Sequence, residues 1–156
     1  MFKDSTASLF DSFAALLEYP SSDFSEHAQE CLELMRSLHP EAADMVEKFA
    51  NAVEKNSLQR MQELFTTTFD MQPVCYPYVG FHLYGESYKR GAFMAQLNEG
   101  YHGIGYSAGQ ELPDNLSVIL RFIGFDSENR YSEFSQALLS DGVLTKKKKM
   151  LKVFSE

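Results

Sequence analysis

The 156-residue sequence contains no tryptophan and only two cysteines, Cys31 and Cys75. Two cysteines are too few for the disulfide framework that stabilises small secreted domains. No apolar run approaches the roughly 18 residues that a membrane span needs. The first residues, MFKDSTASLFDSF, carry acids within their apolar run and lack the hydrophobic region of a signal peptide. These absences predict a cytoplasmic protein with no stable membrane association.

Positive charge is also scarce, except at the C-terminal end. The net charge is -8, and residues 143–156 hold five lysines and one acid (+4), so the other 142 residues carry -12. An acidic surface repels nucleic-acid phosphates and attracts basic partners. We therefore expect no nucleic-acid binding. The run Lys146–Lys149 is more typical of a solvated helix face than of a site for anionic surfaces.

Apolar residues recur at helical spacing along most of the chain, and no segment alternates as a strand does. The pattern predicts helices from Asp4 or Ser5 to Pro20, from 21–23 to 38, from 40 to 53, from 57 to 69, from 86 to 101, from 113 to 123, and one or two over 128–154 with an interruption near 141–142. The sequence thus predicts a single all-α domain, residues 1–156, built as a bundle of about seven helices. Side chains predicted to face the core include Met45, Val46, Phe49, Val53, Leu58, Met61, Leu64, Phe65 and Phe69.

Two patterns raise the alternative of a small hydrolase. GYSAG (105–109) fits the G-x-S-x-G pattern with Ser107 as nucleophile, but such an elbow needs a strand before it, and a helix is predicted there. His27 and Cys31, four residues apart on a helix, could share a metal, but a zinc site needs two further ligands. We expect a flexible loop at Ser107, a buried thiol at Cys31 and no metal site.

Residues 64–116 gather polar side chains among apolar ones, around the break made by Pro73, Pro77 and Gly80. Tyrosines offer rigid contact area with a polar tip, and carboxylates can hold an arginine through paired hydrogen bonds. Such a surface suits a basic amphipathic peptide. Internal bracing is an equal alternative, since Glu86 and Arg90 are spaced i, i+4 on one helix.

Three segments resemble the nitrate reductase delta-subunit family, the NarJ-type chaperones related to the TorD/DmsD group. They are ELFTTTFDMQP (63–73), YPYVGFHLYGESYKRGAFMAQL (76–97) and ELPDNLSVILRFI (111–123), which occur in the family's order and spacing. The resemblance covers roughly residues 9–155. One position departs from it, because Asn115 stands where the family usually has a histidine, and asparagine cannot become cationic.

The resemblance implies an all-helical, non-enzymatic chaperone, and a helical bundle of this kind is expected to be a monomer or a dimer. Its partner would be the N-terminal, twin-arginine-type segment of a molybdenum oxidoreductase catalytic subunit, held while the molybdenum cofactor is inserted. It implies no permanently bound cofactor and at most transient contact with the molybdenum cofactor. A structural subunit of a reductase complex is a further alternative. The expected peptide-binding residues are Asp70, Tyr78, His82, Tyr84, Glu86, Arg90, Glu111, Pro113 and Asp114.

Overall fold

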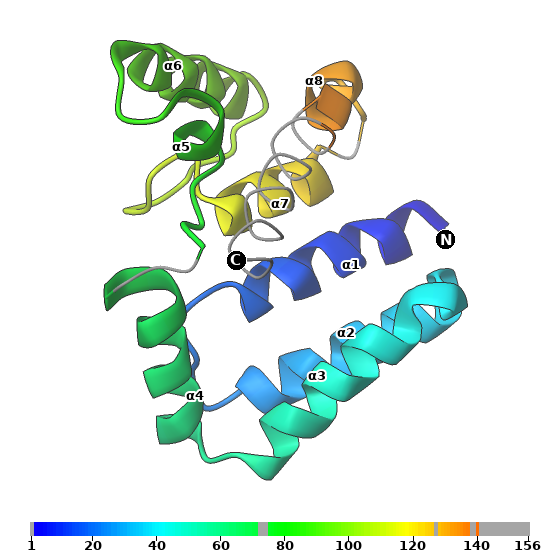
Figure 1. The fold of residues 1–156 in the computed structure, drawn as a ribbon. Coiled ribbons are helices and arrows are strands. Elements are labelled where there is room, and N and C mark those ends of the chain that lie inside the picture. The colour runs from blue at the N-terminus through cyan, green and yellow to red at the C-terminus, as the bar shows by residue number, and fades with distance from the viewer. Residues whose placement is uncertain (1, 72–74, 127, 138–139, 141–156) are drawn as a thin grey trace.

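The structure is a computed structural model that describes residues 2–71, 75–126, 128–137 and 140, with the backbone alone for 2–4. Within these ranges the chain forms eight α-helices and no strand, so the all-α prediction is confirmed with one helix more than expected (Figure 1). The helices are Phe2–Leu16 (α1), Phe24–Leu38 (α2), Ala43–Lys55 (α3), Leu58–Thr66 (α4), Val79–Tyr84 (α5), Tyr88–Gly103 (α6), Leu116–Phe125 (α7) and Ser132–Ala137 (α8). A short 3-10 helix, Pro40–Ala42 (η1), precedes α3, and a π-helical turn, Thr67–Met71 (η2), continues α4.

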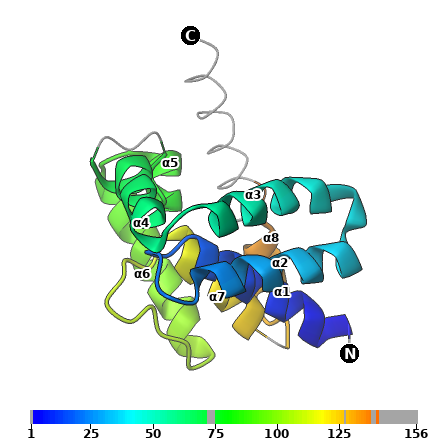
Figure 2. The same cartoon turned by 90° about the horizontal axis from the view of Figure 1, so that it is seen from below.

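Helix α1 is the layer that two hydrophobic cores share. On one side it meets α2 and α3, where its Leu9 joins the core of those helices. On the other side Ala14 joins the core formed with α5, α6 and α7. Phe13 packs against both cores. Figures 1 and 2 both show α1 beside α7 and beside the α2–α3 pair, so the helices fold around it.

Helix α4 places only part of its apolar face against a core, because Met61 packs against the core of α2 and α3 while Leu58 and Leu64 do not. Ser57 caps it as predicted, accepting a hydrogen bond from the Arg60 amide at 3.2 Å. However, α4 has no buried residue, and Leu58 and Leu64 are 40% and 38% exposed. The prediction that these side chains point into a core was wrong, as it was for Met45, which is 79% exposed on α3. In Figure 1, α4 stands beside the end of α1 and across from α5 and α6.

The break predicted around the prolines and Gly80 is present, but it contains the short helix α5, which the sequence pattern did not predict. The segment before α5 pairs antiparallel with the segment before α7 through an isolated bridge between Tyr78 and Asn115. The Val79 amide donates to the Asp114 carbonyl and the Leu116 amide donates to the Pro77 carbonyl, each at 2.8 Å. This pairing brings the two polar segments of the sequence together.

Helix boundaries around this pairing differ from those expected. α6 continues to Gly103, two residues beyond its predicted end. α7 begins at Leu116, not at Pro113 or Asp114, because Asn115 is its N-cap and accepts a hydrogen bond from the Ser117 amide at 2.9 Å. Of the one or two helices predicted over 128–154, the described residues contain α8. The predicted interruption near 141–142 and the lysine run lie outside the described residues. In the part of the chain that is described, no helix has the length and apolar character to cross a membrane.

Candidate functional site

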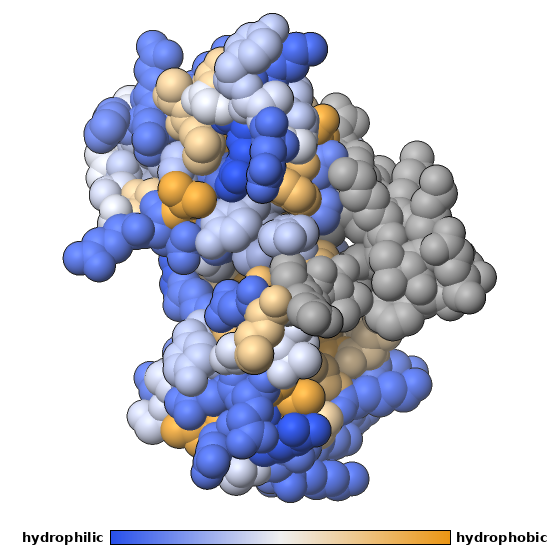
Figure 3. Space-filling view, turned by 60° about the vertical axis from the view of Figure 1, so that its left-hand side comes forward, coloured by the Kyte–Doolittle hydropathy of each residue, from blue (hydrophilic) through white to orange (hydrophobic). Residues whose placement is uncertain are grey.

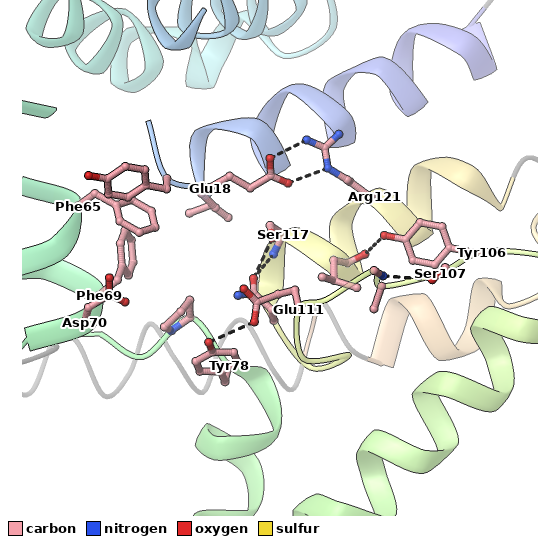
Figure 4. Close-up of a pocket in the computed structure, with 17 residues that line it drawn as sticks. Glu18, Phe65, Phe69, Asp70, Tyr78, Tyr106, Ser107, Glu111, Ser117 and Arg121 are labelled. Carbon is pink, nitrogen blue, oxygen red and sulfur yellow. Dashed lines mark hydrogen bonds and ion pairs between the residues drawn. The ribbon is translucent and has the colours of Figure 1, made fainter. Parts of the chain in front are cut away.

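A cavity of about 650 Å³ lies where the end of α1, the η2 turn, the segment before α5 and the loop before α7 meet (Figure 4). We call it the polar groove. Three carboxylates and one guanidinium line it, so the ionised lining carries more negative than positive charge. Its polar lining residues include Glu18, Asp70, Tyr78, Ser107, Glu111 and Arg121. This balance favours a cationic ligand over an anionic one.

The three carboxylates differ in how free they are to bind a ligand. Glu18 accepts two hydrogen bonds from Arg121, at 2.9 and 3.1 Å, and this pairing raises the pKa of Arg121. Glu111 accepts hydrogen bonds at its Oε1 from the Tyr78 hydroxyl at 3.3 Å and from the Leu112 amide at 2.8 Å, and the residue is otherwise exposed. Asp70 has no ion pair or side-chain hydrogen bond with any residue in the described ranges. Asp70 and Glu111 are therefore the carboxylates available to an incoming cation.

Tyr78 links these acids to the scaffold. Partial burial and the Glu111 carboxylate raise the pKa of Tyr78, so the phenol stays protonated and donates to Glu111 at neutral pH. The guanidinium carbon of Arg90 lies 5.4 Å from the centre of the Tyr78 ring, which supports its position through a cation–π contact. The ring is thus held between a cation behind it and a carboxylate at its tip.

A second cavity, of about 470 Å³, opens next to the first between α4 and the α1–α3 helices. We call it the apolar groove. Thr68 is its only lining residue with a polar side chain among the described residues, and its apolar lining includes Phe13, Leu16, Phe24, Phe49, Met61 and Leu64. Leu17, Phe65 and Phe69 line both grooves and form a wall between them. Figure 3, which turns the α4 side toward the reader, shows apolar surface among polar side chains in the lower half of the molecule.

The wall between the grooves is a small aromatic cluster. The rings of Phe65 and Phe69 lie 4.8 Å apart, and Tyr19 meets Phe65 edge-on at 5.6 Å. Since Phe69 and Asp70 are adjacent on the η2 turn, one short segment supplies both an apolar wall and a free carboxylate. The combined surface can receive an extended or helical segment that is basic at one end and apolar at the other.

Two of the expected site residues are paired with each other inside the protein. The Asp114 side chain is fully buried, and its carboxylate binds the Arg90 guanidinium at two points, 2.8 and 3.2 Å. Glu86, four residues before Arg90, makes no ion pair among the described residues and is exposed. Glu86 lies before the N-cap of α6, so the expected pairing of Glu86 and Arg90 on one helix is absent, and Arg90 is held by Asp114 across the fold.

The remaining expected residues lie around this pair and do not line either groove. His82 is buried, with its Nε2 2.7 Å from the Tyr76 carbonyl oxygen. Pro113 is buried, and its carbonyl accepts a hydrogen bond from the Tyr101 hydroxyl at 2.6 Å. Tyr84 is 42% exposed with its ring 5.5 Å from that of Phe93. The structure thus brings Asp70, Tyr78 and Glu111 together at the polar groove, and places the other six expected residues apart from it.

Sequence reasoning missed several groove residues. Glu18 and Arg121 are 103 positions apart in the chain, so no local spacing in the sequence predicts that they pair. The apolar face of α4 was recognised but assigned to a core. Periodicity shows that α4 has an apolar face, but it does not show what covers that face.

Ser107, His27 and Cys31, the residues that raised the hydrolase alternative, have structural surroundings that do not form a catalytic or metal site among the described residues. Ser107 is exposed, and its Oγ accepts a hydrogen bond from the Gly109 amide at 3.1 Å. No histidine lines the polar groove among the residues described. Cys31 is fully buried, which raises its thiol pKa, while His27 lies near Asp23 and Glu30. Within the described ranges no three or more His, Cys, Asp or Glu side chains gather closely enough to hold a metal ion.

The family assignment follows from a match over most of the chain. Residues 35–154 match the nitrate reductase delta subunit family. The chain belongs to this family. The fold is similar to the crystal structure of a protein from Archaeoglobus fulgidus described as a candidate redox enzyme maturation protein, with a TM-score of 0.61 and 21% identity. That similarity covers 86% of this chain and 79% of the other. No curated protein matches the sequence.

Membership in the delta-subunit family has direct consequences. The chaperones of this family are non-catalytic, so Ser107 is not a catalytic nucleophile. The family implies a chaperone role in molybdoenzyme assembly and an association with nitrate reductase. The two adjoining grooves then become the natural candidates for the surface that contacts the client enzyme.

Proposed function

We propose that this protein is a cytoplasmic, system-specific chaperone that binds the N-terminal, twin-arginine-type segment of a molybdoenzyme catalytic subunit. Binding would hold the subunit during insertion of the molybdenum cofactor, before export or membrane attachment. The observation that carries the proposal is the wall of Leu17, Phe65 and Phe69, which joins an acidic groove to an apolar one. We assign the molybdenum cofactor to the client and not to a resident site in the chaperone.

The polar groove suits the basic part of such a segment. Arginine binds carboxylates through two parallel hydrogen bonds, and Asp70 and Glu111 are the acids with unused capacity. Glu18 is already neutralised by Arg121, so we assign it a role in fixing α1 against α7. Among the nine residues expected from the sequence, we therefore propose Asp70, Tyr78 and Glu111 as peptide contacts. Arg90 and Asp114 support this surface from behind through the Tyr78 ring and the segment before α7.

The apolar groove suits the hydrophobic part of the segment. It is open to solvent, and Leu64 and Phe49 on its walls are 38% and 39% exposed. Covering such side chains contributes about 25 cal/mol per Å² of apolar area. Ordering a flexible segment costs several kcal/mol of the gross interaction. The net affinity is therefore moderate, which permits the release that a transient chaperone needs.

The test is a calorimetric titration with a peptide of the N-terminal residues of a nitrate reductase catalytic subunit. Exposed ion pairs each contribute up to about 1 kcal/mol, so D70N/E111Q should weaken binding roughly tenfold. A matched control is E99Q/E133Q, which removes two acids on α6 and α8 outside both grooves and should leave the affinity within about twofold. Equal losses in both double variants, or no binding by the folded wild-type chain, would contradict the proposal.

Co-purification with the mature enzyme separates a chaperone from a structural subunit. A chaperone that releases its client should be absent from the mature, cofactor-loaded enzyme. Stoichiometric co-purification with that enzyme would instead support the structural-subunit alternative.

A further inference from the structure

We infer that the basic C-terminal segment of this chain, residues 144–154, docks into the polar and apolar grooves when no client is bound. The segment reads LTKKKKMLKVF and lies outside the described residues. Docking would make it an internal competitor of the client. The docking itself does not depend on the proposed function, whereas its regulatory consequence does.

The chemistry of the segment matches that of the two grooves in kind and in order. Lys146–Lys149 form a block of positive charge, and Met150, Leu151, Val153 and Phe154 follow it. A basic stretch followed by an apolar stretch is also the arrangement of a targeting peptide. The polar groove offers Asp70 and Glu111, and the apolar groove begins at the Phe69 wall beside Asp70. A segment laid across that wall would place its lysines and its apolar residues in the matching grooves.

The overall charge distribution favours the same contact. Residues 143–156 carry +4 and the other 142 residues carry -12, which together give the net charge of -8. A tethered cationic segment is attracted to the acidic body, and the strength of that attraction falls with salt. Charge alone would place the segment anywhere on an acidic surface. The adjoining apolar groove is what selects this place.

The chain is long enough to make the contact. Tyr131, immediately before α8, lies against the C-terminal half of α7, with its ring 5.7 Å from that of Phe122. Ser117 and Val118, at the other end of the same helix, line the polar groove. A helix the length of α7 spans about 15 Å. Lys146 is six residues beyond Ser140 and can lie about 20 Å from it in an extended chain, and Phe154 can lie about 25 Å further on.

Tethering makes weak docking effective. A segment in the same chain as its binding site meets that site at an effective concentration of up to about millimolar, so a contact too weak to detect between separate molecules can still be substantially occupied. The apparent affinity for a client is then reduced by the fraction of molecules in which the grooves are open. A client that uses arginines and a longer apolar stretch can displace the segment.

The docking is tested on the full chain, without any client. A nitroxide attached through S155C, with buried Cys31 and Cys75 left unmodified, reports which methionine methyl signals it broadens. Docking predicts broadening of Met61, which lines the apolar groove, but not of Met94, which lies on α6 and lines neither groove. M150S/L151S/V153S/F154S keeps every lysine and should abolish the broadening. An unbroadened Met61 signal, or broadening that survives this variant, would overturn the inference.

Mixing experiments distinguish docking within one chain from docking between copies. Spin-labelled chains without isotope are mixed with isotope-labelled chains without spin label. Docking within one chain predicts no broadening of Met61 in the mixture. Broadening of Met61 in the mixture would show that the segment of a second copy occupies the groove and would overturn the internal form.

The regulatory consequence is measured separately, by calorimetry with the nitrate reductase peptide. M150S/L151S/V153S/F154S leaves the net charge unchanged and should raise the affinity about threefold or more. If this variant bound the peptide with unchanged affinity while Met61 was broadened in the wild-type chain, the segment would dock without regulating client binding. Met61 broadening in a chain that binds no peptide would instead contradict the proposed function alone.

Discussion

The guanidinium of Arg90 and the carboxylate of Asp114 form a two-point ion pair between α6 and the loop that precedes α7, 24 residues apart in the sequence. The acid is fully buried and the arginine side chain is 18% exposed. The Asp114 carbonyl also accepts the Val79 amide, so this one residue ties α6, α7 and the start of α5 together. The pair lies behind Tyr78 and fixes the segments before α5 and α7 that line the polar groove.

Asp114→Asn should therefore destabilise the fold. Removing one member of a buried ion pair costs about 3–5 kcal/mol, because the partner is left without a compensating charge. The measurement is urea unfolding at neutral pH. Glu86→Gln removes an exposed acid four residues from Arg90 and should change the unfolding free energy by less than about 0.5 kcal/mol. Similar losses in the two variants would show that Arg90 depends on both acids.

Gly80→Ala should also destabilise the protein, for a steric reason. A Cβ at Gly80 would lie 2.6 Å from the Asp114 Oδ2 and 2.9 Å from the Phe93 Cδ1. Overpacking of this kind costs about 1–3 kcal/mol. Gly91→Ala is the matched control, because nothing lies within 4 Å of a Cβ in its position on α6. There the substitution should stabilise the helix by roughly 0.5–1 kcal/mol. The measurement is the midpoint of thermal unfolding of both variants. A Gly80→Ala protein with the wild-type midpoint would contradict the steric prediction.

Asn115 is expected to act as the N-cap of α7. Its Oδ1 accepts hydrogen bonds from both the amide and the hydroxyl of Ser117 at 2.9 Å. Asn115→Ala should cost about 1 kcal/mol of stability, as capping substitutions typically do. Asn115→Ser keeps a capping oxygen and should retain most of the stability, measured in the same urea series. If both variants unfolded at the wild-type concentration, capping would not be the role of this residue.

The stability of the fold should decline at high pH through Tyr106. Burial raises the pKa of this phenol to about 12 from an ordinary value near 10, and its hydroxyl donates to the Val118 carbonyl at 2.9 Å. Above pH 10 the unfolded chain loses this proton before the folded one does. The stabilisation is therefore complete below pH 10 and is lost as the pH rises toward 12.

The check is the unfolding midpoint of the wild type and of Tyr106→Phe between pH 8 and 12. Phenylalanine cannot ionise, so the decline should be shallower in the variant. Some decline should remain, because burial also raises the pKa of Tyr101. Identical pH profiles would show that Tyr106 does not carry the effect.

Much of the fold was accessible from local patterns in the sequence. Apolar periodicity located α1, α2, α3 and α7 to within a few residues, and Ser57 marked the start of α4. These features depend on neighbours in the chain. α5 was missed because its six residues lie in a segment rich in proline and glycine, where a pairing with residues 114–116 stabilises the local structure.

The site was accessible only in part, because its parts come from distant segments. Asp70, Tyr78 and Glu111 were expected and do meet at one groove. Asp114 was expected at the surface, yet its carboxylate is buried against Arg90. The position of the apolar groove was not predicted, because the α4 side chains that line it were assigned to a core. An amphipathic stripe indicates that one face of a helix will be covered. It does not indicate whether the core of the same protein or another chain covers that face.

The central claim is that the two grooves form one peptide-binding surface. It is tested most directly by methyl NMR of the methionine-labelled full chain during titration with the nitrate reductase peptide. Met61 lines the apolar groove, Met35 is buried between α2 and α3, and Met94 lies on α6 and lines neither groove. We predict a saturable shift of Met61, with Met35 and Met94 unchanged. Saturable binding that shifts Met94 and leaves Met61 in place would contradict the account.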